Sequence, residues 1–182
     1  MRVQTTSLPG VLMFVPDPVR DDRGFFTRTF DAVAAAEHGL DPAAFIQDSQ
    51  SRSNQGVVRG LHGRRGRGEG KLVRCSSGAV HDVVVDARPE SPMFGRHEVF
   101  VLDDREFRHL YIPPGMLHGF QVLTVWADVC YRIDRPHDPS EDIAVRHDDP
   151  SLGIRWPLPV TMMSERDRGA ASWFELCLEV GR

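Results

Sequence analysis

A histidine, a lysine and a tyrosine in this sequence have side chains that can accept a proton, stabilise negative charge and donate a proton. His62 ends the segment 58–62, Lys71 begins the segment 71–74 and Tyr131 follows Val129 and Cys130. The unperturbed pKa of histidine, about 6.5, leaves its imidazole neutral and able to accept a proton near physiological pH. Each residue alone also fits a structural role, as a histidine at a strand end, a solvated lysine and a core tyrosine. Their chemistry therefore depends on the elements that position them.

Short apolar runs of strand length recur along the chain and are separated by Gly, Pro, Asp and Ser. Runs rich in β-branched and aromatic residues, bounded by turn residues, are typical of strands, and their number predicts an all-β sandwich or barrel. The runs are residues 10–15, 71–74, 80–86, 97–102 and 109–112. Helical patterns are limited to residues 30–38 and 164–178. Residues 63–70, with four glycines and three arginines, indicate a surface loop between His62 and Lys71.

Length and composition predict one globular domain over residues 1–182, because 41% hydrophobic and 26% charged residues are ordinary values. A net charge of -4 argues against nucleic acid as a partner. The three cysteines are odd in number and widely spaced, which excludes a disulfide framework and favours a reducing cytoplasm. No apolar stretch approaches the ~20 residues of a membrane helix and no signal peptide is evident, so we expect no membrane contact.

Seven segments resemble, in the same order and at matching separations, successive motifs of one enzyme family. They are Asp22-Arg-Gly-Phe-Phe26, Gln47-Asp48, Ser51-Arg-Ser53, Val58-Arg-Gly-Leu-His62, Gly70-Lys-Leu-Val-Arg74, Ile112-Pro-Pro-Gly115 with His118-Gly-Phe120, and Asp148-Asp-Pro150 with Gly153-Ile-Arg-Trp156. The family is that of the dTDP-4-dehydrorhamnose 3,5-epimerases, and the resemblance spans roughly residues 10–168. It implies a double-stranded β-helix (cupin jelly roll) with a few short helices. It also implies epimerisation of a dTDP-4-keto-6-deoxyhexose at C3, at C5 or at both, in deoxysugar biosynthesis.

The resemblance assigns four catalytic residues. An epimerase of this kind needs a base, a group that stabilises the enolate oxygen and an acid on the opposite face. His62 would be the base, and Asp167 would orient it and stabilise its charged form. Lys71 would place an ammonium beside the developing oxyanion. Tyr131 would return the proton from the other side, which inverts the carbon.

The resemblance also implies a set of binding residues. Arg23, Gln47 and Arg59 are similar to family contacts to the sugar nucleotide, since arginine matches phosphate oxygens, and His118 would add a polar contact. Phe26 lies where the family's N-terminal segment reaches a neighbouring subunit. A homodimer with shared sites is therefore expected.

Five binding positions depart from the family, and they leave open the nucleotide base and whether one or two carbons are inverted. The departures are Arg28 for glutamate, Ser49 for asparagine, His137 for tyrosine, Asp142 for glutamate and Arg166 for lysine. His137 can still stack on a base, and Asp142 and Arg166 keep the charges of the residues they replace.

We expect neither a metal nor another cofactor. Residues 113–115 followed by His118 match the second cupin motif, in which a histidine ligates a metal. The first cupin motif requires His-x-His followed by a glutamate, whereas this chain has His62, Gly63 and Arg64 with Glu69 further on. Because arginine is not a metal ligand, the full site is missing.

Two other functions remain open from the sequence. One is a cupin that binds a small carbonyl or sugar ligand without catalysis, for which binding would survive the loss of His62 and Tyr131. The other is an enzyme recruited to a different proton-transfer or cyclisation reaction on a non-nucleotide substrate. The altered residues Arg28, Ser49 and His137 motivate this second alternative.

Overall fold

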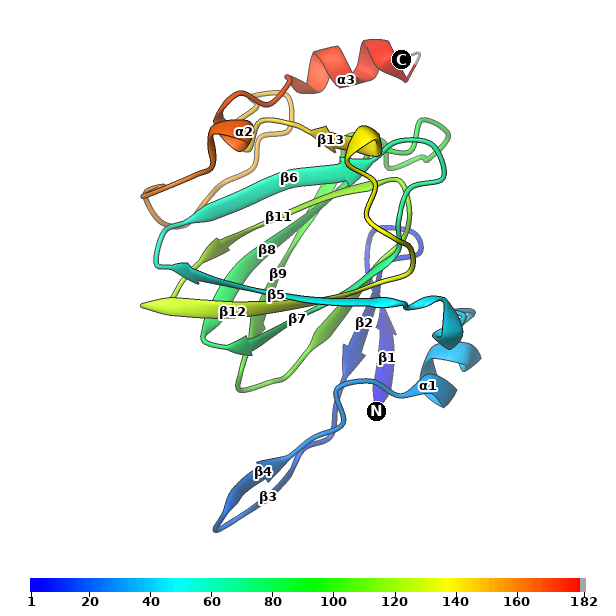
Figure 1. Ribbon diagram of the computed structural model, residues 1–182, viewed down its shortest axis with the longest axis vertical. Helices are drawn as coiled ribbons and strands as arrows, with labels where there is room; N and C mark the ends of the chain where they lie inside the picture. The colour runs from blue at the N-terminus through cyan, green and yellow to red at the C-terminus, as the bar shows by residue number, and fades with distance from the viewer. Residues whose placement is uncertain (181–182) are drawn as a thin grey trace.

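Two antiparallel sheets face each other in the computed structural model, which describes residues 1–180 (Figure 1). The six-stranded sheet has the order β1 (Arg2–Thr5), β2 (Leu12–Val15), β10 (His109–Ile112), β7 (Lys71–Ser77), β12 (Trp126–Ile133) and β5 (Gln47–Asn54). The five-stranded sheet has the order β13 (Asp142–Ala144), β6 (Val58–Arg64), β11 (Met116–Val122), β8 (Ala79–Asp86) and β9 (His97–Asp103). The all-β jelly-roll architecture expected from the sequence is confirmed.

The five-stranded sheet is buried on both faces along its strand β8. Val80 and Val84 contribute to the core between the sheets, whereas the alternate residues Val83 and Val85 belong to a second cluster on the outer face. Side chains alternate between the two faces of a strand, so burial of both faces explains why residues 80–86 read as a nearly continuous apolar run. Trp173, from the C-terminal segment, belongs to the outer cluster.

The helices are short and begin at side-chain caps. In α1 (Ala32–Glu37), the carboxylate of Asp31 accepts hydrogen bonds from the backbone N–H groups of Val33 and Ala34. The helices α2 (Glu165–Arg168) and α3 (Trp173–Glu179) begin after the capping residues Ser164 and Ser172. The chain also contains the 3-10 helices η1 (Pro42–Ala44) and η2 (Pro139–Glu141). Such caps satisfy the free N–H groups of the first helical turn. Both expected helical regions are confirmed.

A two-stranded hairpin, β3 (Val19–Asp21) and β4 (Gly24–Phe26), projects from the sandwich (Figure 1). Its apolar side chains are exposed, with Phe26 at 75% and Val19 at 66% of full exposure. Exposed apolar residues gathered on one projecting element are typical of an interaction surface.

The expected single domain of residues 1–182 includes residues 181 and 182, which lie outside the described part of the chain. Within residues 1–180, none of the helices combines the length and the apolar character that crossing a membrane requires.

Packing of α3 on the outer face of the five-stranded sheet predicts a large effect of one substitution. Trp173 is 8% exposed and its ring lies 5.0 Å from that of Phe94. We expect Trp173→Ala to lower the free energy of unfolding by about 3 to 5 kcal/mol, because it leaves a cavity in an apolar cluster. Urea unfolding at fixed protein concentration measures this loss. The neighbouring Phe174 is 65% exposed, so Phe174→Ala should change stability by less than about 0.5 kcal/mol. Equal losses in the two variants would contradict the packing argument.

Candidate active site

A cavity of about 280 Å³ lies between the two sheets and collects most of the residues expected to act in chemistry or binding. Its walls include Ser49, Arg59, His62, Lys71, His118, Tyr131, His137, Asp142 and Arg166. His62 and His118 come from the five-stranded sheet, whereas Lys71 and Tyr131 come from the six-stranded sheet. A larger hollow of about 690 Å³, lined in part by residues 65–67 and α3, contains none of the four expected catalytic residues.

His62 and Asp167 form a close pair. The Nε2 atom of His62 lies 2.7 Å from a carboxylate oxygen of Asp167, and the other oxygen accepts a hydrogen bond from the Gly60 N–H. Burial opposes ionisation of Asp167, but the hydrogen bonds from His62 and Gly60 outweigh it and lower the pKa of this carboxyl. An ionised carboxylate only accepts hydrogen bonds, so Nε2 carries the hydrogen. Nδ1 of His62 then keeps a lone pair that can accept a proton.

Two glycines bring β6 and β11 close together beside this pair. Gly60 has φ +134, and a Cβ atom there would lie 2.5 Å from the Cα of Gly119. The pairing register places His62 opposite His118 and shifts between His118 and Phe120. Only glycine permits both this backbone conformation and this close approach. The contact sets the position from which His62 enters the cavity.

Tyr131 enters the cavity from β12. It pairs with Ser49 on β5 and with Val73 on β7, and its ring centroid lies 6.2 Å from that of His118. Burial is the main cause that raises the pKa of the Tyr131 phenol above its ordinary value, and the negative charge of Asp82 raises it further. The phenol is therefore protonated at neutral pH and can act as a proton donor.

His118 forms a second histidine–carboxylate pair in the sheet opposite Tyr131. Its Nε2 atom lies 2.8 Å from Asp82, and both side chains are almost fully buried. Asp82 lies between Val80 and Val84, on the face of β8 that points into the sandwich. The pair fixes the orientation of the His118 ring at the cavity wall.

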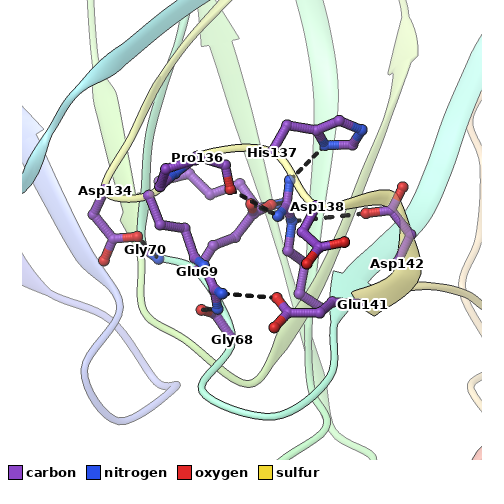
Figure 2. A network of polar contacts seen from close by, with 12 residues as sticks. Gly68, Glu69, Gly70, Asp134, Pro136, His137, Asp138, Glu141 and Asp142 are labelled. Atoms are coloured by element: carbon purple, nitrogen blue, oxygen red, sulfur yellow. Dashed lines mark hydrogen bonds and ion pairs between the residues drawn. The ribbon is translucent and has the colours of Figure 1, made fainter.

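Lys71 is buried and belongs to a network of charges at one side of the cavity. Its Nζ atom lies 2.9 Å from one carboxylate oxygen of Glu69, and Arg64 Nε lies 2.6 Å from the other. Arg64 also donates a hydrogen bond to Nδ1 of His137 at 2.6 Å, as Figure 2 shows for the labelled His137. Arg166 lies 3.0 Å from Asp142. The network extends from Lys71 to the residues expected to hold the nucleotide.

Arg59 contributes an exposed cation to the same cavity. Its Nε atom donates a hydrogen bond of 2.9 Å to the hydroxyl of Ser53. This bond leaves the terminal guanidinium nitrogens free of that contact, so they remain suited to an anionic group.

Four of the expected binding residues lie outside the cavity lining in this chain. Arg23, Phe26 and Arg28 are exposed and lie on or just after the projecting hairpin, where Arg28 pairs with Asp31 at 2.6 Å. Gln47 begins β5 and is half-buried, at the end of the strand beyond Ser49. The three hairpin-region residues are therefore not part of this cavity.

Sequence reasoning missed three charged residues that matter to the geometry: Asp82, Arg64 and Glu69. Asp82 had a usable signal, because a charged residue at an inward position between Val80 and Val84 requires a buried partner. Arg64 and Glu69 were noted only because they break the cupin metal motif. In the structure these two residues form an ion pair, and within residues 1–180 no three His, Cys, Asp or Glu side chains converge as a metal site.

Comparisons with known proteins identify a family that this chain matches over most of its length. The family model described as dTDP-4-dehydrorhamnose 3,5-epimerase matches residues 5–175. The dTDP-4-dehydrorhamnose 3,5-epimerase of Escherichia coli (strain K12) is 42% identical over 159 residues, 86% of this chain and 85% of that protein. The dTDP-4-dehydrorhamnose 3-epimerase of Streptomyces niveus is 37% identical over 171 residues, 93% of this chain and 83% of that protein.

A solved structure shares the whole fold. It is NovW, a 4-keto-6-deoxy sugar epimerase from the novobiocin biosynthetic gene cluster of Streptomyces spheroides. The TM-score is 0.93 at 36% sequence identity, and the match covers 100% of this chain and 91% of that one.

The lowered pKa of Asp167 predicts a pH-dependent contribution to stability. The carboxyl releases its proton at lower pH in the folded chain than in the unfolded chain, so its contribution is present above the unfolded pKa, about 3.9, and is lost as pH falls through the folded value. We expect Asp167→Asn to unfold more easily than wild type at about pH 5, with a difference that shrinks towards about pH 2. Urea unfolding of both proteins across this range measures the difference. A difference that stays constant with pH would refute this role for the Asp167 charge.

Proposed function

The chain belongs to the dTDP-4-dehydrorhamnose 3,5-epimerase family, and on this premise we propose that it epimerises a dTDP-4-keto-6-deoxyhexose at C3, at C5 or at both carbons. It is then an isomerase that removes a proton beside the ketone and returns one on the opposite face. The observation that supports this most directly is the 2.7 Å pair of His62 and Asp167 in a cavity whose opposite wall contains Tyr131 and Lys71.

Proton abstraction is the step proposed for His62. Asp167 accepts the Nε2 hydrogen, so the lone pair of Nδ1 is the atom that takes the proton from carbon. The imidazolium formed by this step lies beside an ionised carboxylate, which stabilises its charge.

Lys71 is proposed to stabilise the enolate oxygen. An ammonium placed beside the oxygen before the reaction lowers the barrier because negative charge grows there only as the proton leaves. The side chain is 8% exposed, and poor access of water strengthens its interaction with the oxyanion.

Tyr131 is proposed to return the proton. Its raised pKa keeps the phenol protonated until the carbanion forms. His62 and Tyr131 come from opposite sheets, so the two proton transfers occur on different faces of a sugar held between them. Inversion at carbon follows from this arrangement.

Arg59, Arg166 and His137 are proposed to bind the nucleotide diphosphate part of the substrate. The two guanidinium groups suit phosphate oxygens, and the exposed imidazole of His137 can stack on a base. The chain is similar both to a 3,5-epimerase and to a 3-epimerase, so the proposal covers inversion at one carbon or at two.

Solvent exchange tests the proposed reaction. With a dTDP-4-keto-6-deoxyhexose in heavy water, wild type should incorporate deuterium at C3, at C5 or at both, as read by NMR. His62→Asn should lower the rate at least about a hundredfold, because the base is lost. Tyr131→Phe should keep part of the exchange but lose inversion. His97→Asn, a histidine on β9 outside the cavity lining, is the matched control and should remain near wild type. No incorporation by wild type at either carbon would end the proposal.

We also propose that the protein is a homodimer in the cytoplasm. The projecting hairpin exposes Val19, Phe25 and Phe26, which a second copy would cover, and it contains or adjoins Arg23 and Arg28. The free thiols of Cys75, Cys130 and Cys177 suit a reducing compartment.

A charged residue on the hairpin tests the dimer. We expect Phe26→Asp to shift the protein towards monomer in sedimentation velocity, because a carboxylate would be buried without a partner in the interface. The exchange rate should fall in parallel if the hairpin serves the neighbouring site. Phe174→Asp, at a similarly exposed phenylalanine on α3, is the control and should leave the oligomeric state unchanged. A wild type that sediments as a monomer contradicts the proposal.

A further inference from the structure

Glu69 joins two buried cations. One carboxylate oxygen lies 2.9 Å from Lys71 Nζ and the other lies 2.6 Å from Arg64 Nε, and the three side chains are 4% to 8% exposed. Buried charges are costly unless they are paired, so removal of the central carboxylate takes away the ion-pair partner of Lys71 and leaves Arg64 only its longer contact with Asp142, at 3.7 Å. The position of the Lys71 ammonium is therefore set by Glu69.

Arg64 connects this pair to the nucleotide side of the cavity. Its terminal nitrogens donate hydrogen bonds to His137 Nδ1 at 2.6 Å and to the backbone oxygen of Pro136 at 3.2 Å, and its Nε atom lies 3.7 Å from Asp142 (Figure 2). One guanidinium thus contacts Glu69 and the segment 136–142 at once.

Hydrogen bonds connect the backbone on both sides of Glu69 to residues 134 and 135, which directly precede this segment. The Gly70 N–H donates to Asp134 at 2.9 Å, and Arg135 donates to the backbone oxygen of Gly68 at 2.7 Å (Figure 2). Gly68 and Gly70 are both buried. Hydrogen bonds therefore hold residues 68–70 and 134–142 together around the Arg64–Glu69 pair.

We propose that Arg64 and Glu69 are positioning residues that hold the Lys71 ammonium and the His137 imidazole at a fixed separation. The inference rests on the function proposed above, in which Lys71 stabilises the enolate and His137 contacts the nucleotide. Glu69 acts on the chemical step through Lys71, whereas Arg64 acts on substrate binding through His137 and Asp142.

The proposal fixes the tautomer of His137. A guanidinium has hydrogen-bond donors only, so Nδ1 of His137 must accept and Nε2 must carry the hydrogen. Loss of the Arg64 donor frees the ring to populate both tautomers, and ¹⁵N NMR of the histidine side chains reads this change directly.

Two glutamine substitutions, one at Glu69 and one at Arg64, separate the effect on the chemical step from the effect on substrate binding. Glu69→Gln should lower kcat by about tenfold or more while KM changes less than about threefold, since a charge-assisted contact to Lys71 is lost. Arg64→Gln should raise KM and the calorimetric Kd for dTDP by about tenfold and give mixed His137 tautomers. Arg64→Lys, which keeps a donor and a charge, should retain the Nε2–H tautomer.

The adjacent arginine supplies the matched control. Arg65 pairs with Glu179 at 2.9 Å, and both side chains are about half exposed outside the cavity lining, so Arg65→Gln should leave kcat, KM and the tautomer unchanged. Lower melting temperatures with unchanged constants and an unchanged tautomer in the Arg64 and Glu69 variants would overturn the proposal. If wild type shows no solvent exchange, the proposed reaction fails, whereas the tautomer in Arg64→Gln still decides whether Arg64 positions His137.

Discussion

The contact between His62 and Asp167 joins residues that are 105 positions apart in the chain, and the chemistry proposed for the cavity depends on it. The imidazole is held on β6 in the sandwich, whereas the carboxylate comes from α2 in the C-terminal segment. Asp167 is buried, and a buried carboxylate is costly unless it is paired. Hydrogen bonds from His62 and from the Gly60 N–H stabilise its ionised form. Residues of the C-terminal segment, Trp173 among them, cover the outer face of the five-stranded sheet. Packing of this segment thus determines where His62 meets Asp167.

Several charged groups inside the sandwich are held in pairs. His118 meets Asp82, Lys71 meets Glu69, and Arg64 meets both Glu69 and His137. Each pair consists of one residue on a cavity-lining strand or loop and a partner that fixes its direction. Pairing of this kind contributes little net stability, because the contacts mainly offset the cost of taking charges out of water. Its effect is an ordered arrangement of charged groups before any substrate arrives, which is the condition for electrostatic catalysis.

The apolar strands and the order of the motifs could be predicted from the sequence, because β8 and β10 bury residues on both of their faces and the motifs lie at matching separations. The strand β5, with the sequence QDSQSRSN, has no such pattern, since one of its faces borders a polar cavity and the other is exposed. The His62–Asp167 pair was predicted from the resemblance alone, and its roles remain predictions. The position of Asp82 between Val80 and Val84 indicates a buried partner, but its pairing with His118, like the pairing of Glu69, could not be derived, because a buried ion pair depends on which segments meet in space. The sequence likewise did not indicate that Arg23 and Phe26 lie on a hairpin outside the cavity, because this depends on how the hairpin is placed relative to the sheets.

The close approach of Gly60 and Gly119 distinguishes two parts of the cavity. Beside His62 the backbone leaves no room for a larger residue, whereas the exposed edge of the cavity has no such restriction. A methyl group at Gly60 would collide with the backbone of β11, so substitution there displaces backbone beside His62 and with it the His62 side chain. Ser49, His137 and Arg166 also line the cavity, but they are exposed, so solvent rather than packed backbone surrounds much of each side chain. In the proposed reaction, the sugar nucleotide that is accepted can therefore change through these three residues while the position of His62 stays the same. Diversification of substrate within one reaction type is the outcome that this geometry favours.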